Sequence, residues 1–489
     1  MGSCRRILLL ALLAALLANT ARAAETLPAR FDAIATIVVV FLENRGHVHL
    51  LPRFAGASGI AEADPATVVQ RDRDGTVLTH LPPVWRHGKP VADPAYPATM
   101  PNAPFAIDAP PYDLPASVVT VSPVHRFYQS RMQINGGRND RFVAWTNVGS
   151  LTMGHYTPET SYLYGLAREF TLADRFFMAA FGGSNLNHFW LACACSPVYP
   201  DAPEAMRAVL DDRGDLALAA ASPASALDGP PVWLRDGSIS PDGFVVNTVQ
   251  PSWQPSGVAP APGGDARFAD PAKHPLPPQH APTIGDRLSD RGVDWAWYAQ
   301  GWNVAHADRD VIYNKGGAVN FQPHHQPFNY FAAYAPGTAA RARHLKDMQD
   351  FWRAAAAGAL PPVVFVKPDG ASNQHPGDNS VAAGDLMAAT IVETLRRSPQ
   401  WPGMAIIVTH DENGGFWDPM PPPSGDRWGP GSRIPTIIVS PLAKKGHVDH
   451  TVYDTTSILK FVSRRFGLEP LPGVRGFVGD LTNAFDLAE

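Results

Sequence analysis

The sequence predicts an α/β fold of three layers, in which helices cover both faces of a mainly parallel β-sheet. Continuous apolar runs at residues 37–42, 363–366 and 404–408 have the length of strands, and none of them alternates with polar residues. Stretches with helical spacing of apolar residues separate the later runs. This alternation favours βαβ units, and therefore an α/β fold over an α+β fold.

Polar residues directly follow each of the three apolar runs. Glu43 and Asn44 follow the first run, Lys367 follows the second, and the third leads into Asp411 and Glu412. In parallel sheets covered on both faces, ligands bind beyond the carboxyl ends of the strands. We therefore expect these distant segments to converge on one pocket.

The C-terminal third contains the clearest helix signals. Residues 381–397 place large apolar side chains on one helical face, which predicts a helix before the strand at 404–408. Residues 434–440 predict another strand, with a proline near its start. A final helix is expected to begin near Asp454 and to stop at Gly467.

The segment from residue 196 to about residue 282 differs from the rest of the chain. It contains clustered prolines and few periodic apolar runs. Glycine and proline together account for 90 of the 489 residues, above their usual share of roughly 12%. We interpret residues 196–282 as a Pro/Gly-rich insertion or cap with some secondary structure of its own, within a single domain at residues 24–489.

The first 23 residues have the pattern of a secretory signal peptide. Arg5 and Arg6 precede an apolar core, and Ala21-Arg22-Ala23 resembles a cleavage signal. The apolar core is shorter than the roughly 20 residues that span a bilayer. The sequence therefore predicts an exported protein, periplasmic or secreted, without stable membrane insertion; both Sec and twin-arginine export fit.

The net charge and the cysteine positions bear on whether the protein binds nucleic acid and whether it forms a disulfide. Without residues 1–23 the chain carries 37 basic and 45 acidic residues, a net charge of −8, and it has no basic stripe. This balance argues against nucleic acid as a partner. Cys193 and Cys195 are the cysteines of the mature chain, and because their i, i+2 spacing rarely allows good disulfide geometry, we expect no disulfide.

The residues at the strand ends form an oxygen-rich set suited to a hard divalent cation. Glu43, Asn44, Asp411 and Glu412 supply carboxylate and amide oxygens, and the two glycines after Asn413 allow a tight turn. A buried carboxylate pair is costly unless it is paired, hydrogen-bonded or bound to a cation. The alternative interpretation is a turn with solvated acids.

A serine and several histidines complete the candidate chemistry. Ser184 lies on a Gly-Gly turn that leads into a helical stretch, where it fits either a nucleophile stabilised by the helix N-terminus or a capping residue. His125, the pair His324-His325, and His375 occur in polar or aromatic loops. Histidines at such positions can contact phosphate or donate a proton, although structural histidines are more common.

These motifs resemble the phosphoesterase family that contains bacterial acid phosphatases and phospholipases C. The matching segments are Glu43-Asn44-Arg45, Gly183-Ser184 with Asn187, His375-Pro376, His410 to Phe416, and Arg433-Ile434-Pro435 with Val439-Ser440-Pro441. Segments 124–129, 133–140 and 321–330 resemble the acid phosphatase branch. The resemblance covers most of the mature chain. It implies an alkaline-phosphatase-like α/β/α core with a loop-rich cap and a phosphoserine mechanism.

The resemblance also implies roles for individual residues. Ser184 would be the nucleophile, and Glu43, Asn44, Asp411 and Glu412 would bind one divalent metal ion together with Ser184. Asn187, His125, His324 and His325 would bind substrate. A histidine would be the general acid, and His375 is our first choice among them. Ca, Mn, Fe and Zn all remain candidates for the metal. The sequence departs from the family where Gly46-His47-Val48 replaces the usual Ser-Phe-Asp, and where Asn185 replaces a Thr-type residue.

The leading hypothesis is an exported acid phosphatase that acts on small phosphomonoesters, with best activity at mildly acidic pH because histidine donors would be protonated there. The first alternative is a phospholipase C-type phosphodiesterase on the same fold. The second alternative is a non-catalytic metal- or anion-binding exported protein. The sequence fixes neither the natural substrate nor the oligomeric state.

Overall fold

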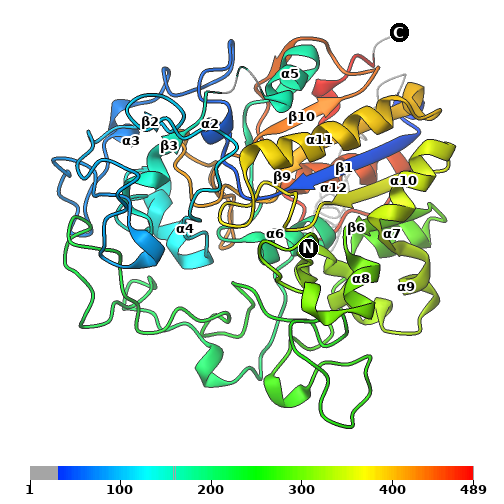
Figure 1. Ribbon diagram of the computed structural model, residues 1–489. Coiled ribbons are helices and arrows are strands. Elements are labelled where there is room, and N and C mark those ends of the chain that lie inside the picture. Colours follow the sequence, from blue (N-terminus) through cyan, green and yellow to red (C-terminus); the bar gives the residue numbers. More distant parts are fainter. Residues whose placement is uncertain (1–30, 158, 160, 488–489) are drawn as a thin grey trace, which may run out of the picture.

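A computed structural model describes residues 31–157, 159 and 161–487 (Figure 1). The predicted signal peptide lies outside these residues. The main sheet has eight strands, in the spatial order β11-β4-β10-β9-β1-β8-β6-β7. Its strands are β1 (Thr36–Leu42), β4 (Thr171–Ala173), β6 (Trp295–Ala299), β7 (Leu345–Asp347), β8 (Val363–Lys367), β9 (Met404–His410), β10 (Thr436–Val439) and β11 (His447–Asp449). Two small sheets pair β2 (Phe105–Ala106) with β3 (Gly154–His155), and β5 (Phe176–Phe177) with β12 (Tyr453–Asp454).

The centre of the main sheet is parallel and buried on both faces. β1 pairs in parallel with β8 on one side and with β9 on the other, so that Val40 lies level with Val366 and Val408. Every residue of β1, β8 and β9 is buried. The three apolar runs are thus adjacent strands whose carboxyl ends meet at one edge, as predicted.

The strand β10 departs from the predicted parallel arrangement. It is antiparallel to both of its neighbours, β9 and β4. The chain between β9 and β10 is a long loop rather than a crossover helix, and without a crossover the returning strand runs in the opposite direction. The sheet is therefore mainly, but not entirely, parallel.

Helices cover both faces of this sheet, which gives the three-layer α/β/α architecture. In Figure 1, α5, α10 and α11 lie in front of the sheet and α12 lies behind it, in contact with α6. The α-helices are α2 (His47–Leu50), α3 (Pro65–Val68), α4 (Phe127–Ile134), α5 (Tyr162–Glu169), α6 (Ser184–Cys193), α7 (Ile284–Asp290), α8 (Trp302–Ala307), α9 (Ala339–His344), α10 (Met348–Ala357), α11 (Val381–Arg396) and α12 (Thr455–Phe466).

The two helices predicted near the C-terminus form within one residue of their predicted bounds. Ser380 caps α11 by accepting a hydrogen bond from the backbone N–H of Ala383. Asp454 caps α12 in a capping box with Ser457, and Gly467 ends α12 in the left-handed conformation. Local capping chemistry therefore sets these boundaries.

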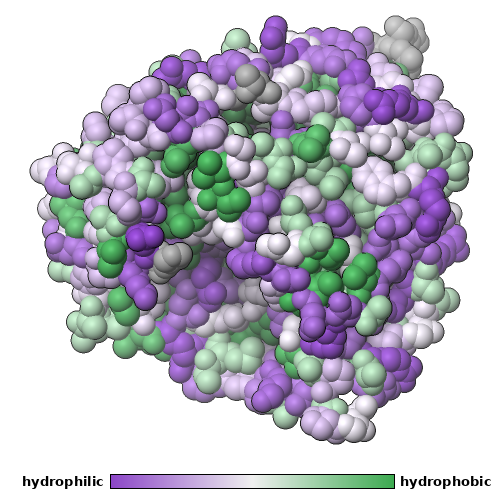
Figure 2. Space-filling view, in the orientation of Figure 1, coloured by the Kyte–Doolittle hydropathy of each residue, from purple (hydrophilic) through white to green (hydrophobic). Residues whose placement is uncertain are grey.

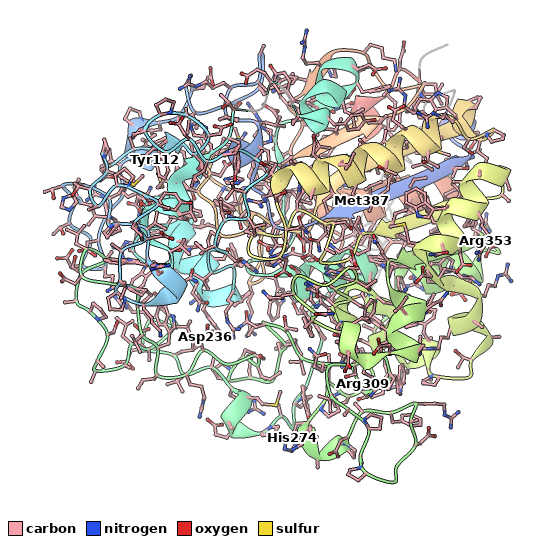
Figure 3. The ribbon with its side chains drawn as sticks, viewed as in Figure 1. Tyr112, Asp236, His274, Arg309, Arg353 and Met387 are labelled. Carbon is pink, nitrogen blue, oxygen red and sulfur yellow. A yellow bond between two sulfur atoms is a disulfide. The ribbon has the colours of Figure 1, made fainter. Side chains whose placement is uncertain are left out.

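Residues 196–282 contain little regular structure. Two short 3-10 helices, Glu204–Met206 and Pro271–Lys273, and isolated bridges such as Val198 with Phe244 organise the segment. The segment is fastened to α4: Asp236, labelled below α4 in Figure 3, contacts Arg126 Nε at 2.7 Å through its carboxylate. The side chain of Asn247 accepts a hydrogen bond of 3.2 Å from the backbone N–H of Phe127.

The expectation of no disulfide is wrong, because Cys193 and Cys195 are bonded. Ala194 between them adopts the left-handed conformation (φ 49°, ψ 41°) at the end of α6. This turn brings the two Cα atoms to 5.2 Å, within the range that a disulfide needs. The i, i+2 spacing thus allows a disulfide here because the intervening residue is left-handed.

Within the described residues, no helix combines the length and the apolar character that crossing a bilayer requires. Hydrophobic and hydrophilic residues are interspersed over the face shown in Figure 2. That face is hollowed left of its centre, on the side where the central strands end, and the residues around the hollow are largely hydrophilic.

Candidate active site

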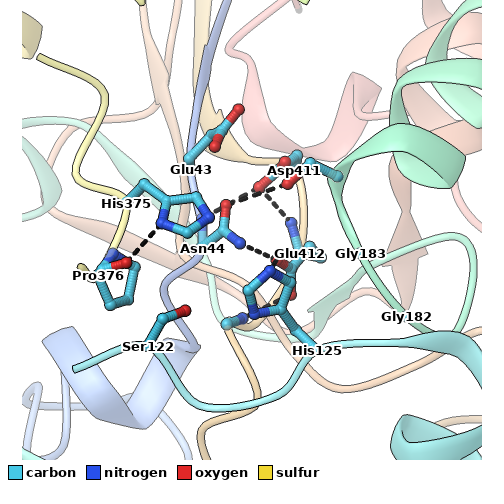
Figure 4. Close-up of polar contacts among 12 residues, drawn as sticks. Glu43, Asn44, Ser122, His125, Gly182, Gly183, His375, Pro376, Asp411 and Glu412 are labelled. Carbon is cyan, nitrogen blue, oxygen red and sulfur yellow. Dashed lines mark hydrogen bonds and ion pairs between the residues drawn. The ribbon is translucent and has the colours of Figure 1, made fainter. Parts of the chain in front are cut away.

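The ends of β1 and β9 bring together Glu43, Asn44, Asp411 and Glu412, which we call the carboxylate cluster (Figure 4). All four residues are fully buried. The backbone N–H of Asn44 donates to Asp411 Oδ1 at 3.0 Å, and the side-chain amide of Asn44 donates to Glu412 Oε1. Gly414 lets the loop after β9 approach this closely: its φ is +66°, and a Cβ there would lie 2.2 Å from the carbonyl oxygen of Asn44.

Ser184 lies beside the carboxylate cluster at the start of α6. Its hydroxyl donates to Asn44 Oδ1 at 3.2 Å. The residue before Ser184 has no room for a side chain, because a Cβ on Gly183 would lie 2.7 Å from the carbonyl oxygen of His125. No side chain caps the helix. The first backbone N–H groups of α6 are therefore available to an anion next to Ser184.

A buried lysine and two histidines surround Glu43. Lys367 Nζ lies 2.8 Å from Glu43 Oε1, and His325 Nε2 contacts the same oxygen. His188, one helical turn after Ser184, stacks against His325 with ring centroids 5.5 Å apart and lies 3.9 Å from Asp411 Oδ2. Neither His188 nor Lys367 was predicted as a site residue. His188 lies one helical turn after Ser184 and Lys367 lies at a strand end, and these positions could have identified both.

The three carboxylates of the cluster differ in their electrostatic surroundings. Burial, followed by repulsion from Glu43, raises the pKa of Asp411 to about 7. Burial and the neighbouring Asp411 raise the pKa of Glu412 well above its usual value. Burial also acts to raise the pKa of Glu43, but the charges of His325 and Lys367 outweigh it and hold that pKa well below its usual value.

The donor set fits a bound divalent cation. Glu43 Oε2 and Asp411 Oδ2 are buried without a hydrogen-bond partner, whereas Glu43 Oε1 contacts Lys367 and His325. Three adjacent carboxylates can all be ionised in a buried site only if a cation neutralises them. A second possible ligand set shares Glu43: the ligand atoms of Glu43, His188 and His325 lie within 4.8 Å of one another.

A cavity of about 540 Å³ opens in front of Ser184. His125, His324 and His375 line it together with Ser184 and Asn185. The rings of His125 and His375 stand edge to face with centroids 5.4 Å apart, and His125 Nε2 lies 3.9 Å from Glu412 Oε1. Three of the predicted histidines thus surround the predicted nucleophile.

The protonation of these histidines differs from the expectation. Burial, and secondarily the charge of His375, lowers the pKa of His125 to about 3. Burial and the charge of His325 lower the pKa of His324 well below its usual value. Burial thus favours the neutral form of both rings, and an anion in the cavity would favour the protonated form.

Two residues that were expected to bind substrate lie outside the cavity lining. The Asn187 amide accepts from the backbone N–H of Ala180 at 3.0 Å and donates to the carbonyl oxygens of Ala180, Gly182 and Gly183, which fixes the turn before Ser184. His325 is fully buried behind the lining and contacts Glu43 instead. Asn187 therefore holds the turn before Ser184, and His325 holds Glu43.

The cavity also contains residues that sequence analysis did not identify. Both polar atoms of the Asn185 side chain are buried without a partner. Asn147, Asn247, Gln250, Tyr313 and Lys315, which we call the pocket wall, line the cavity from separate loops. Asn247 and Gln250 come from the Pro/Gly-rich segment. No periodic pattern marks these loop residues, whereas Asn185 was detectable as the residue that replaces a Thr-type residue after Ser184.

Comparisons with known proteins identify the family of this chain. A sequence model of the phosphoesterase family matches residues 34–469. Phospholipase C A of Mycobacterium tuberculosis is 25% identical over 94% of this chain and 79% of that protein. The hemolytic phospholipase C of Pseudomonas aeruginosa is 23% identical over 92% of this chain and 55% of that protein. A solved structure from the alkaline phosphatase superfamily of Vibrio parahaemolyticus is similar with a TM-score of 0.32 and 11% identity, over 77% of this chain and 75% of that one.

Proposed function

Because the chain belongs to the phosphoesterase family, we propose that it is an exported, metal-dependent phosphatase that hydrolyses small phosphomonoesters through a phosphoserine intermediate at Ser184. The observation that carries this proposal is the position of Ser184, which lines one cavity with three histidines and donates a hydrogen bond to the carboxylate cluster buried beside it. The pattern of residues 1–23 supports the export part of the proposal.

In the proposed reaction, Ser184 Oγ attacks phosphorus and the leaving-group oxygen departs. Asn44 Oδ1 accepts a hydrogen bond from the Ser184 hydroxyl and so orients it. A divalent cation held by Glu43, Asn44, Asp411 and Glu412 with Ser184 would neutralise the buried negative charge and stabilise the serine alkoxide. The free N–H groups at the start of α6 would bind phosphoryl oxygens.

In this proposal, His375 donates the proton that the leaving group needs. Its Nδ1 lies 2.6 Å from the carbonyl oxygen of Pro376, so Nδ1 carries a proton and donates it to that oxygen. The second proton of an imidazolium would then be on Nε2, which is the nitrogen left for the substrate. After proton transfer, the neutral ring can accept a proton from the water that hydrolyses phosphoserine.

The lining of the cavity supports a small polar leaving group. Apart from Pro123, Val124, Gly183 and Leu186, the lining residues carry hydrogen-bonding or charged side chains. An acyl chain needs an apolar wall, and a quaternary ammonium is usually held by an aromatic cage. Tyr313 alone does not form such a cage.

A phospholipase C-type phosphodiesterase is the second candidate, and the named relatives favour it. Hydrolysis of p-nitrophenyl phosphate and of p-nitrophenylphosphorylcholine by one purified preparation, measured from pH 4 to 9, separates the two candidates. We expect the higher kcat/KM with the monoester. A higher value with the choline diester would replace the proposed substrate class, and no turnover of either ester would favour a non-catalytic binding protein.

Ser184→Ala tests the nucleophile directly. Removal of the attacking oxygen should lower kcat by at least about 10³-fold, and acid quenching with a ³²P-labelled ester should trap phosphoserine only in the wild type. Ser122→Ala is the matched control, because Ser122 lines the same cavity and its hydroxyl contacts only the carbonyl oxygen of Pro123, at 3.4 Å. Near-normal turnover by Ser184→Ala would rule out Ser184 as the nucleophile.

A further inference from the structure

A lysine buried at the end of β8 needs a physical explanation. Lys367 is fully buried, and its Nζ lies 2.8 Å from Glu43 Oε1 and 3.5 Å from the carbonyl oxygen of Leu42. Phe41 presents its ring to the same ammonium at 5.4 Å. Burying an ammonium costs several kcal/mol unless a partner offsets the cost. The partner here is a residue that also belongs to the carboxylate cluster.

The ammonium also lies against a possible set of metal ligands. Glu43, His188 and His325 hold their ligand atoms within 4.8 Å of one another. His188 Nε2 and His325 Nδ1 have no hydrogen-bond partner, and His325 Nε2 contacts Glu43 Oε1. One carboxylate and two imidazoles with an open position resemble the ligand sets of catalytic zinc ions. This set shares only Glu43 with the ligands assigned to the first cation.

Charge balance shows how many cations the buried site can accept. Glu43, Asp411 and Glu412 contribute three negative charges when ionised, and Lys367 contributes one positive charge. The remaining charge of −2 is matched by one divalent cation. Two divalent cations together with Lys367 would leave a buried charge of +2, which is strongly unfavourable.

We propose that the Lys367 ammonium takes the position of a second cation and so restricts the site to one divalent metal ion. A metal bound through Glu43 Oε1 would lie about 2.0–2.2 Å from that oxygen, next to the ammonium that already contacts it. The two positive charges compete for one carboxylate. This inference depends on the metal-binding part of the proposed function and not on its substrate.

Zinc stoichiometry tests this inference. Each protein is stripped with a chelator, incubated with excess Zn²⁺, separated from free ions by gel filtration and assayed by elemental analysis. We expect one zinc per chain in the wild type and two in Lys367→Met, which keeps the length of the side chain without its charge. The double variant Lys367→Met/His188→Ala should bind one zinc per chain, because His188 is a ligand of the second set only.

Lys367→Arg is the matched control, because it preserves the charge and should bind one zinc. Two zinc ions in the wild type or in Lys367→Arg, or one in folded Lys367→Met, would overturn the inference. Lys367→Met leaves Glu43 without its partner, so we expect a lower melting temperature without metal and a larger rise with Zn²⁺ than in the wild type. A Lys367→Met chain that stays unfolded with Zn²⁺ would also contradict it.

No substrate enters this assay, so its result is separable from the proposed function. A protein that binds one zinc through the first ligand set but fails to hydrolyse any phosphoester would refute the phosphatase and leave the role of Lys367 standing. A protein that hydrolyses phosphomonoesters with two zinc ions bound would support the phosphatase and refute the role of Lys367.

Discussion

The carboxylate cluster lies buried beside Ser184, the pocket wall lines the cavity in front of Ser184, and the two regions are built differently. The carboxylate cluster follows two neighbouring strands, and its four residues are fully buried. Hydrogen bonds join Asn44 to Asp411 and Glu412. The pocket wall comes from loops between residues 147 and 315, and its Lys315 side chain is 64% exposed. We therefore propose that the sheet holds the metal-binding groups and that the loops supply groups that contact the leaving group.

This difference predicts two kinds of response to substitution. A buried charged group has few alternative partners, so its loss changes the electrostatics of the whole site. An exposed wall residue can be replaced by water, so its loss changes affinity by a small factor. Substitutions in the carboxylate cluster should abolish metal binding or turnover, and substitutions in the pocket wall should change substrate preference.

Asp411→Asn should have the largest effect in this comparison. The substitution keeps the shape of the side chain but removes a charge that the cation needs. We expect loss of the metal and a fall in kcat/KM beyond the roughly 10- to 100-fold that loss of an outer-shell partner costs. Elemental analysis and a phosphoester assay measure both effects.

Asp418→Asn is the matched control for a buried aspartate. Asp418 pairs with Arg433 Nε at 2.9 Å, away from the carboxylate cluster. Its loss should destabilise the protein by about 3–5 kcal/mol but leave metal content unchanged. Equal metal content in Asp411→Asn and the wild type would remove Asp411 from the ligand set.

Without metal, the stability of the protein should depend on pH because the buried carboxylates repel one another. The pKa of Asp411 is raised to about 7 in the folded state, against about 3.9 in an unfolded chain. Between these values the folded state holds the proton more tightly, so this group destabilises the fold progressively as pH rises from about 4 to 7. In EDTA, the melting temperature of the wild type relative to Asp411→Asn should fall across that range. A constant difference would contradict the raised pKa.

The sequence predicted the carboxylate cluster because each component follows an apolar run. Such runs identify buried strands, and the ends of parallel strands meet at one edge. The bounds of α11 and α12 were predictable for a similar local reason, since Ser380, Asp454 and Gly467 cap them. The antiparallel direction of β10 was not predictable, because the direction of a strand depends on the loop before it.

The pocket wall could not be predicted from the sequence. Gln250 and Tyr313 are 63 residues apart and meet through a hydrogen bond of 3.0 Å, and neither lies in a periodic segment. The Cys193–Cys195 disulfide depends on one left-handed residue. Long-range loop packing and single backbone angles leave no periodic signal in a sequence.

Asn185 lies between the two regions, and its substitution should have an intermediate effect. It follows Ser184 on α6 and lines the cavity with unpartnered polar atoms. We expect its amide to donate to a phosphoryl oxygen, so Asn185→Ala should lower kcat/KM by about 10- to 100-fold, the value of a hydrogen bond to a charged group. Asn185→Asp should be worse than Asn185→Ala because it repels the phosphate. An unchanged Ki for inorganic phosphate in both variants would refute the contact.

Lys315→Ala should have the smallest effect and tests the pocket wall itself. The Lys315 ammonium lies 2.6 Å from Asp378, whose carboxylate is buried and also accepts from Gln322 at 3.1 Å. An exposed ion pair contributes roughly 0.2–1 kcal/mol, so KM for a phosphomonoester should rise by no more than about fivefold with kcat unchanged. The increase should shrink at high salt, because screening weakens an exposed charge, and Lys315→Arg should restore the wild-type KM. A fall in kcat comparable to that of Asp411→Asn would show that the wall takes part in chemistry, and the division between sheet and loops would then be wrong.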